Sequence, residues 1–287
     1  MRGKLKSKFV SRKIEDLITL YVPAFIIAFV IIGPIAYMFF TSVISDVDAI
    51  EFGKTLQIPS TITFEPYIRV FKIVRLAKAL YDTSVYSLLS AISVTLVALI
   101  AGYAFSFFRF RGRRISLKFF IFIQLIPGYA LLIPMFMYAR TLGIYDTYWA
   151  LLFTFGGFTV SFALWMAFTF FGLTPHELHD SAMIDGCSEL QTFVRIFLPL
   201  ISPGIVAVFV YVFITSWIQF MWPLILTNVN VRAVPVEMTL LWSQTQYLIS
   251  FNYIMAGGII TLVPPVAVAL VFQKWLIKGL TAGAVKG

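Results

Sequence analysis

Charged side chains are scarce in this chain of 287 residues. Only 12% of the residues are charged and 60% are hydrophobic, whereas a typical soluble protein has a charged fraction of about 25%. This composition excludes a water-soluble globular domain. The apolar runs are near-continuous and about twenty residues long, without the alternation of a β-barrel strand. We therefore expect an all-α membrane protein.

Residues typical of disulfides, phosphate-binding loops, metal sites and catalytic sites are also rare. The single cysteine, Cys187, permits no internal disulfide. Gly3-Lys4 lacks both the upstream glycine and the following Ser or Thr of a phosphate-binding loop, and Gly53-Lys54-Thr55 lacks the upstream glycine. His176 and His179 have no third ligand nearby, so we expect exposed helix residues and no metal site. No convergent carboxylates, Ser/His pair or set of metal ligands lies within an apolar run, which argues against an intramembrane enzyme.

The apolar runs also contain essentially no ionisable side chains, since Lys118 and Lys274 stand close to the ends of their runs. Carriers driven by ions or protons usually need such groups at mid-depth, so a self-sufficient secondary carrier is disfavoured. The polar residues in these runs are neutral: Gln124, Thr154, Thr159, Ser161, Thr169, Thr215, Ser216, Gln219 and Thr261. They suit a neutral, polyhydroxylated ligand, although we expect most of them to hold helices together.

Six apolar runs are each long enough to cross a membrane. They lie at about 18–42, 84–108, 117–139, 148–171, 203–227 and 252–276. Residues 1–17 precede the first run, and a long external segment of about 45–82 precedes the second. The first run is long, contains Pro23 and Pro34, and lacks a small-residue cleavage site, so it is not a cleavable signal peptide.

The distribution of positive charge predicts the orientation. If the N-terminus is cytoplasmic, 15 of the 22 Lys and Arg residues lie on the inner side. Because cytoplasmic loops are enriched in positive residues, both termini and the polar loop at 172–202 are predicted to face the cytoplasm. The Arg109–Arg114 run is then a topology anchor, and the net charge of +9 requires no nucleic-acid partner.

The polar loop contains two helix starts and one helix stop. Thr174–Glu177 and Ser188–Gln191 both have the form of a capping box. The first is predicted to start a short helix that Gly186 ends. The second is predicted to start a helix that runs to about Phe197, before Pro199 breaks the chain. A loop with this organisation is expected to present a docking surface to a partner.

Small and acidic side chains mark the first of these helices. Ser181 and Ala182 keep the side-chain bulk low near the turn, which would let a groove on the partner approach closely. Asp180 and Asp185 supply hydrogen-bond acceptors. Each residue alone fits an ordinary solvated face, and the two successive caps make docking the better interpretation.

The same loop resembles a known family motif. It reads Asp180-Ser-Ala-x-x-Asp-Gly186, nine further residues, and then Ile196-x-Leu-Pro199. It looks like the cytoplasmic loop of permease subunits in binding-protein-dependent ABC importers, which reads E-A-A, three residues, G, nine residues, I-x-L-P. Asp180 and Ser181 depart from that pattern but keep the charge sign and the small size.

Two further segments narrow the resemblance to the carbohydrate-uptake permeases of the maltose/trehalose type. Ser216–Leu224 resembles the S-W-[NED]-x-F-x-W-P-L segment of sugar permeases. The tail at Gln273–Gly287 is similar to that of the second, shorter permease of those systems, and Arg109–Arg113 and Ile126-Pro127 also fit. The resemblance covers nearly the whole chain.

The resemblance implies a fold and a set of partners. The fold is a permease domain at 18–278, with six transmembrane helices and a coupling helix between spans four and five. The implied partners are a paralogous permease, an ABC ATPase dimer that binds ATP and Mg, and an extracytoplasmic sugar-binding protein. The implied location is the plasma membrane of a prokaryotic cell. This chain is expected to hold no cofactor and to move a di- or oligosaccharide.

The resemblance also implies roles for particular residues. The coupling helix that enters a cleft on the ATPase would comprise Asp180, Ser181, Ala182, Met183, Asp185 and Gly186. The C-terminal tail at 279–287 would reach the ATPase through Gly279, Thr281, Gly283 and Lys286.

A path for the solute is harder to place. Gln219 offers an amide for sugar hydroxyls, and Trp217 and Trp222 offer rings for stacking. The three cannot share one face of a helix, and Trp222 falls near the outer end of its run, where tryptophan is common. Two alternatives stay open: most sugar contacts lie on the partner permease, or the solute is another one, such as glycerol phosphate.

Overall fold

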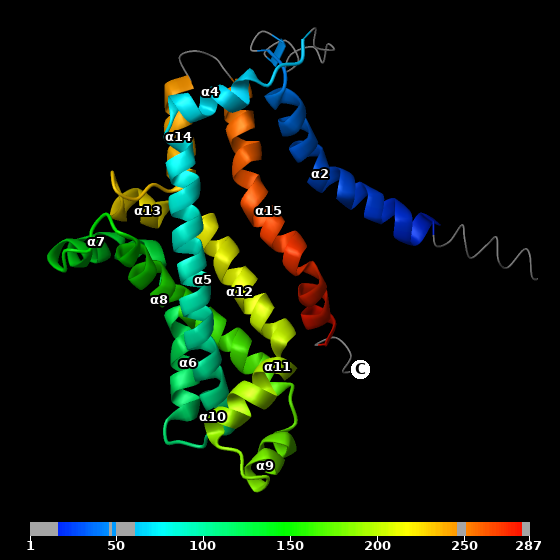
Figure 1. Cartoon of the computed structure of the whole chain (residues 1–287), viewed down its shortest axis with the longest axis vertical. Helices are drawn as coiled ribbons and strands as arrows, with labels where there is room; N and C mark the ends of the chain where they lie inside the picture. Colours follow the sequence, from blue (N-terminus) through cyan, green and yellow to red (C-terminus); the bar gives the residue numbers. More distant parts are fainter. Residues whose placement is uncertain (1–16, 46–47, 50–60, 246–250, 283–287) are drawn as a thin grey trace, which may run out of the picture. The chain divides into compact units, whose positions relative to one another are not determined.

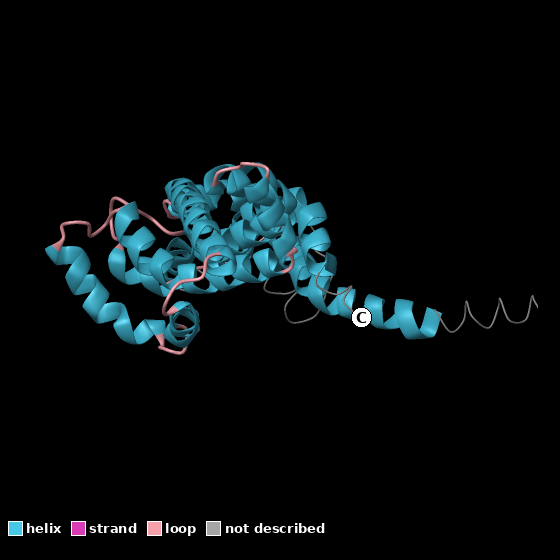
Figure 2. Cartoon of the chain, turned by 90° about the horizontal axis from the view of Figure 1, so that it is seen from below, coloured by secondary structure: helices cyan, strands magenta, loops and turns pink. Residues whose placement is uncertain are grey.

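The structure is a computed structural model that describes residues 17–45, 48–49, 61–245 and 251–282. The regular elements of this part are helices joined by loops (Figure 2), apart from one isolated antiparallel bridge between Ile44 and Ile62. The all-α prediction is confirmed. Residues 1–16, most of the external segment before residue 61, and Gly283 and Lys286 of the tail lie outside the described residues.

Four described helices are long and apolar enough to cross a membrane: Thr19–Ser42, Leu76–Phe107, Tyr148–Gly172 and Phe251–Ile277. Two further pairs pass the same test together, although each is sharply bent. Arg113–Ile123 and Gly128–Thr141 meet at 84°, and Glu189–Leu200 and Ser202–Trp217 meet at 80°. The described residues therefore contain six candidate spans if each bent pair counts as one.

The described chain divides into two compact units. The first contains the described residues up to Ile73 together with Leu241–Ile260. Its helices are η1 (Leu17–Tyr21), α2 (Val22–Ser42), α4 (Glu65–Ile73) and the first turns of α15 (Phe251–Ala282). The side-chain amide of Asn252 donates to the Ile44 carbonyl at 3.1 Å, and the hydroxyls of Ser42 and Tyr67 lie 2.6 Å apart.

The second unit contains Val74–Leu240 and the described residues from Thr261 onward. Its core is formed by α5 (Leu76–Phe107), α8 (Tyr148–Gly172) and α12 (Ser202–Trp217), whose buried faces share one hydrophobic cluster. Small residues allow the close approach of α5 and α8, because a Cβ on Gly102 would lie 2.9 Å from the Cβ of Ala167. The Tyr86 hydroxyl donates to the Ser216 carbonyl at 2.6 Å and ties α5 to α12.

The third predicted span differs from the expectation. The continuous run at 117–139 is divided into α6 (Arg113–Ile123), η2 (Gly128–Leu131) and α7 (Leu132–Thr141). Pro127 has an extended backbone, with φ −61° and ψ 104°, and it cannot donate to a helical hydrogen bond. Apolar content alone predicted one helix, and this proline interrupts it.

Two other boundaries differ as well. The second span begins at Leu76 and not near residue 84, so its first two turns come from the segment predicted as external. The fifth predicted run at 203–227 consists of α12, a break at 218–220, and the short helix α13 (Met221–Leu226). The break includes Gln219.

Candidate functional site

The polar loop folds into a short helix, α9 (His176–Ile184), followed by a second helical segment. The prediction that Thr174 caps α9 is wrong. Pro175 occupies the N-cap position, and α9 has no side-chain cap. The Thr174 hydroxyl instead donates backwards to the Phe171 carbonyl at 2.6 Å, at the end of α8. Thr174 therefore helps to end the preceding helix.

The predicted stop at Gly186 is confirmed. Gly186 has φ +82°, a left-handed conformation that favours glycine. Its N–H donates to the Met183 carbonyl at 3.2 Å, and the Cys187 N–H donates to the Ala182 carbonyl at 3.0 Å. This pair of bonds forms a Schellman motif, which satisfies carbonyls that would be free at the end of α9.

The second capping box is also confirmed. The Ser188 side chain accepts from the Gln191 N–H at 3.3 Å, and the Gln191 side chain accepts from the Ser188 N–H at 2.9 Å. The predicted end near Phe197 is wrong. Helical structure continues through α10 (Glu189–Gln191), η3 (Thr192–Phe197) and α11 (Leu198–Leu200), because a proline in the first turn of α11 is tolerated. The chain bends at Ile201.

The side chains of α9 divide into an exposed face and an anchored face. Asp180, Ser181, Met183, Asp185 and Gly186 are all exposed. Ala182 is 3% exposed, so its small size serves packing within the chain. An exposed apolar residue that the sequence analysis did not select, Ile184, is 86% exposed at the end of the helix.

The anchored face centres on His179, which is not the exposed residue predicted from the sequence. Its side chain is 13% exposed, and its Nε2 lies 3.1 Å from Glu189 Oε2. The same carboxylate oxygen accepts the Tyr103 hydroxyl of α5 at 2.9 Å. The imidazole also lies parallel to Phe107 of α5, with centroids 5.0 Å apart. These contacts join α9, α10 and the end of α5.

Within the second unit, α9 and the loop at residues 227–233 lie at opposite ends of α5 (Figure 1). The start of α6, which carries Arg113 and Arg114, lies at the same end as α9. The segment between α13 and α14 (Val234–Thr245) contacts the first turns of α5 through Lys78 and Asp82.

The three predicted solute-path residues do not converge. Trp217 is 3% exposed, and its Nε1 donates to the Thr261 carbonyl at 3.3 Å, so it belongs to the helix core. Gln219 lies half-buried in the break after α12. Trp222 is 4% exposed, although we expected it in an interfacial belt. Of the three, only Trp222 lines a cavity found among the described residues.

That cavity has a volume of about 280 Å³ and lies in the second unit. Its lining comes from the end of α6, the break that follows, η2, α8, α12 and α13. The lining residues are Ile123, Gln124, Ile126, Gly128, Tyr129, Phe155, Phe158, Thr159, Phe162, Tyr211 and Trp222. Aromatic rings and neutral hydrogen-bonding groups therefore surround it. Sequence reasoning missed most of them because they come from separate helices.

The tail residues proposed to meet the ATPase are described in part. The backbone of Gly279 and Thr281 continues α15, which ends at Ala282. Gly283 and Lys286 lie outside the described residues. The predicted role of the tail stays a prediction.

An acidic residue that the sequence analysis did not select holds the loop at residues 227–233. Asp146 has φ +60°, and its carboxylate accepts the backbone N–H groups of residues 228–231 at 2.7–3.2 Å. Burial is the largest effect and raises the pKa of the Asp146 carboxyl, but the four donors together outweigh it and hold this pKa below its usual value. Single-sequence patterns give no signal for such a contact.

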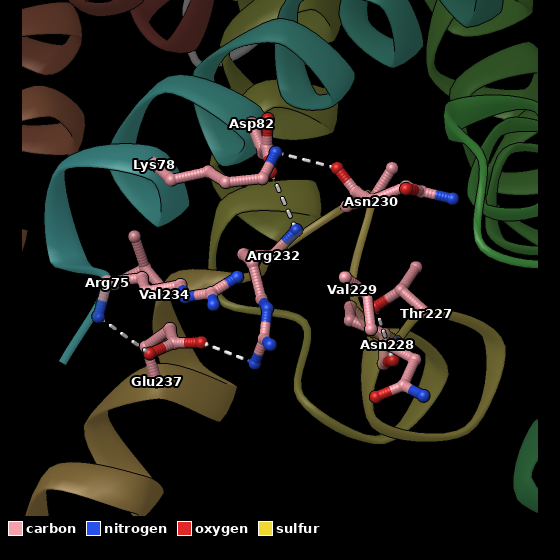
Figure 3. A network of polar contacts seen from close by, with 12 residues as sticks. Arg75, Lys78, Asp82, Thr227, Asn228, Val229, Asn230, Arg232, Val234 and Glu237 are labelled. Carbon is pink, nitrogen blue, oxygen red and sulfur yellow. Dashed lines mark hydrogen bonds and ion pairs between the residues drawn. The ribbon is translucent and has the colours of Figure 1, made fainter.

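Two further carboxylates fix the same loop (Figure 3). Asp82 accepts the Arg232 N–H at 2.7 Å and Lys78 Nζ at 2.8 Å. Glu237 accepts the Arg75 N–H at 3.2 Å and the Arg232 guanidinium at 2.9 Å. Asp82 and Glu237 are 1% and 2% exposed, so these buried charges are paired. These bonds attach the loop to α5 and α14.

The comparisons with known proteins agree with this architecture. Residues 94–282 match the family described as "Binding-protein-dependent transport system inner membrane component". The chain is 32% identical over 273 residues to the trehalose/maltose transport system permease protein MalG of Thermococcus litoralis, covering 94% of this chain and 97% of that protein. It is 31% identical over 265 residues to the probable ABC transporter permease protein y4oR of Sinorhizobium fredii, covering 91% and 92% of the two chains.

A solved structure has the same fold. A chain of a bacterial ABC transporter involved in the import of the acidic polysaccharide alginate superimposes with a TM-score of 0.72 at 22% identity. The match covers 93% of this chain and 98% of that chain. The matched family, the length of the matches and the apolar helices lead to one conclusion: the protein is a multi-pass membrane protein that belongs to the family of inner membrane components of binding-protein-dependent ABC transport systems.

Proposed function

We propose that this chain is the shorter of two permease subunits in an importer that uses ATP to take up a neutral di- or oligosaccharide. Its longer paralogue would complete the path, an ABC ATPase dimer would supply the energy, and an extracytoplasmic binding protein would deliver the sugar. ATP and Mg would bind to the ATPase. Both termini would face the cytoplasm of a prokaryotic cell.

The observation that carries this proposal is the construction of α9. One face of α9 is exposed, and the helix ends in a Schellman motif. His179 anchors the opposite face to α5. A short helix held in this way transmits a push or pull as a rigid element, because its end is hydrogen-bonded and does not fray. ATP-driven closure of the ATPase dimer would move α9 and, through Phe107 and Tyr103, the end of α5.

The assignment of a neutral sugar rests on the relatives and on the cavity. MalG of T. litoralis is named for trehalose and maltose transport. The described residues that line the cavity include no Asp, Glu, Lys or Arg, so the cavity offers no countercharge to an anion such as glycerol phosphate. Hydroxyl and amide groups beside aromatic rings suit a neutral sugar.

The test is reconstitution of the complex with its proposed partners in proteoliposomes. We expect maltose or trehalose, added with the binding protein, to stimulate ATP hydrolysis and to be taken up, whereas glycerol 3-phosphate should do neither. Gly186→Pro should abolish both activities while the complex stays assembled, because proline can neither adopt φ +82° nor donate to Met183. Normal coupled transport by the assembled variant would refute the role of α9. Uptake by this chain alone would refute dependence on the ATPase.

A further inference from the structure

Two helix breaks meet at the 280 Å³ cavity. One is the interruption between α6 and α7, which contributes Gln124, Ile126 and Gly128. The other is the interruption between α12 and α13, and Trp222 is the second residue of the helix that follows it. Two interruptions far apart in the sequence therefore border one cavity.

The first break has irregular backbone hydrogen bonding. Its N–H groups at Gln124, Leu125 and Ile126 donate to carbonyls three residues earlier, so the regular helical ladder has ended. Irregular backbone at membrane depth is tolerated where it is buried in protein or lines a water-filled cavity. In transporters, broken helices of this kind mark binding sites. The first break is therefore compatible with a polar occupant at this cavity.

The aromatic walls of the cavity are held in place. Trp222 is a nearly buried wall of the cavity, and its ring stacks on Phe158 with centroids 5.7 Å apart and planes 28° apart. Tyr211 packs on Phe162 with a centroid distance of 4.8 Å. A side chain on Gly128 would place its Cβ 3.9 Å from Trp222 Cζ2, so this glycine keeps the space above the indole free.

The polar groups of the lining are all uncharged. Gln124 lies exposed at the break, and Tyr129 is 61% exposed. The Thr159 hydroxyl donates to the Phe155 carbonyl at 2.9 Å, which leaves its oxygen able to accept another hydrogen bond. Together they offer an amide and several hydroxyls around aromatic faces. An acyl chain would leave these groups without partners, and an anion would find no countercharge.

We propose that this cavity binds one ring of the transported neutral sugar, so that this subunit itself holds a solute subsite. This inference rests on the proposed function. The C–H faces of the sugar would lie against the aromatic walls, whose π faces are electron-rich. Its hydroxyls would bond to Gln124, Thr159 and Tyr129. A volume of 280 Å³ is close to the lower end of the range of about 300–1,000 Å³ for small-molecule pockets, which suits one ring and not a whole oligosaccharide.

The first test is thiol protection in the assembled complex. Cys187→Ser first removes the native thiol of this chain. Two variants on this background then carry Gln124→Cys or Leu125→Cys. Both positions are exposed and adjacent, but only Gln124 lines the cavity. We expect maltose or trehalose, whichever the complex transports, to slow maleimide labelling at position 124 and not at position 125. Equal labelling with and without sugar would overturn the proposal. So would an unreactive thiol at 124 without sugar, because side chains of the partner permease would then fill the cavity.

The second test is transport kinetics. Gln124→Met keeps the length of the side chain and removes its hydrogen bonds, so the KM for uptake of the sugar should rise about 3- to 10-fold, the effect of losing one neutral hydrogen bond. Leu125→Met should leave KM unchanged. If the two variants had equal KM values in a complex that transports sugar, the subsite would be refuted. The proposed function would not be affected by that result. A wild-type complex that transports no neutral sugar would refute both.

Discussion

The imidazole of His179 lies parallel to the phenyl ring of Phe107, with their centroids 5.0 Å apart and their planes 9° apart. Phe107 is the last residue of α5, and His179 lies in the middle of α9. This stack joins the candidate docking helix to a long membrane helix. Any movement of α9 is therefore expected to reach α5 through these two rings.

Replacement of His179 by alanine should uncouple ATP hydrolysis from transport. The change removes the stack on Phe107 and the contact with Glu189, which together contribute about 1–2 kcal/mol to the attachment of α9. The measurement is the number of sugar molecules taken up per ATP hydrolysed by the reconstituted complex. Glu177→Ala, at an exposed position of the same helix, is the matched control. An unchanged ratio in His179→Ala would show that α9 transmits force without this anchor.

Gly186→Val and Gly186→Asn should differ in effect although both add a side chain. A Cβ on Gly186 meets nothing within 4 Å, so the cost comes from the left-handed backbone alone. That conformation costs most residues about 1–2 kcal/mol, and asparagine tolerates it better than valine. Sugar-stimulated ATPase activity should fall in the order wild type, Asn, Val. Equal activity of the Asn and Val variants would contradict the strain argument.

Gly102→Ala should destabilise the protein, whereas Gly157→Ala should not. The added Cβ at Gly102 would lie 2.9 Å from the Ala167 Cβ and 3.0 Å from the Phe168 backbone nitrogen, so α5 and α8 must separate. Overpacking of this kind costs about 1–3 kcal/mol. A Cβ at Gly157, also in α8, meets nothing within 4 Å. Thermal unfolding of the purified variants measures the difference, and similar midpoints for both would refute the close approach of the helices.

Asp146→Asn should destabilise the loop at residues 227–233 at neutral pH. Asparagine tolerates φ +60°, so the backbone is kept, but its amide has one acceptor oxygen for four N–H donors. A cost of about 1–3 kcal/mol is expected, as for unsatisfied buried groups. Asp185→Asn, the same change at an exposed position, should have little effect on the thermal midpoint.

The effect of Asp146→Asn should also depend on pH. The folded-state pKa of Asp146 is lowered. The stabilisation by its carboxylate is therefore fully present above the ordinary aspartate pKa of about 3.9, and it is lost as the pH falls through the lower folded-state pKa. The gap in thermal midpoint between wild type and Asp146→Asn should narrow below about pH 4. A gap that stays constant through this range would mean that the carboxylate charge does not hold the loop.

Local patterns predicted the parts of this protein that depend on neighbouring residues. Ser188 and Gln191 cap each other three residues apart, and Gly186 ends a helix through its own φ, so both were readable from short segments. Thr174 has the same pattern as Ser188, yet it bonds to Phe171, because the end of α8 offers a free carbonyl at that point. A capping pattern that directly follows another helix is therefore ambiguous.

The sequence by itself determined that the chain lies in a membrane, how many apolar runs it has, and where α9 ends, because these follow from hydropathy and local backbone preference. Only the tertiary structure decided that His179 anchors α9, that Asp146 binds residues 228–231, and that Trp222 and Gln124 border one cavity. In each case the partners are distant in the chain. Their contact depends on how α5, α8 and the broken helices pack, and this packing cannot be read from the periodicity of a single sequence.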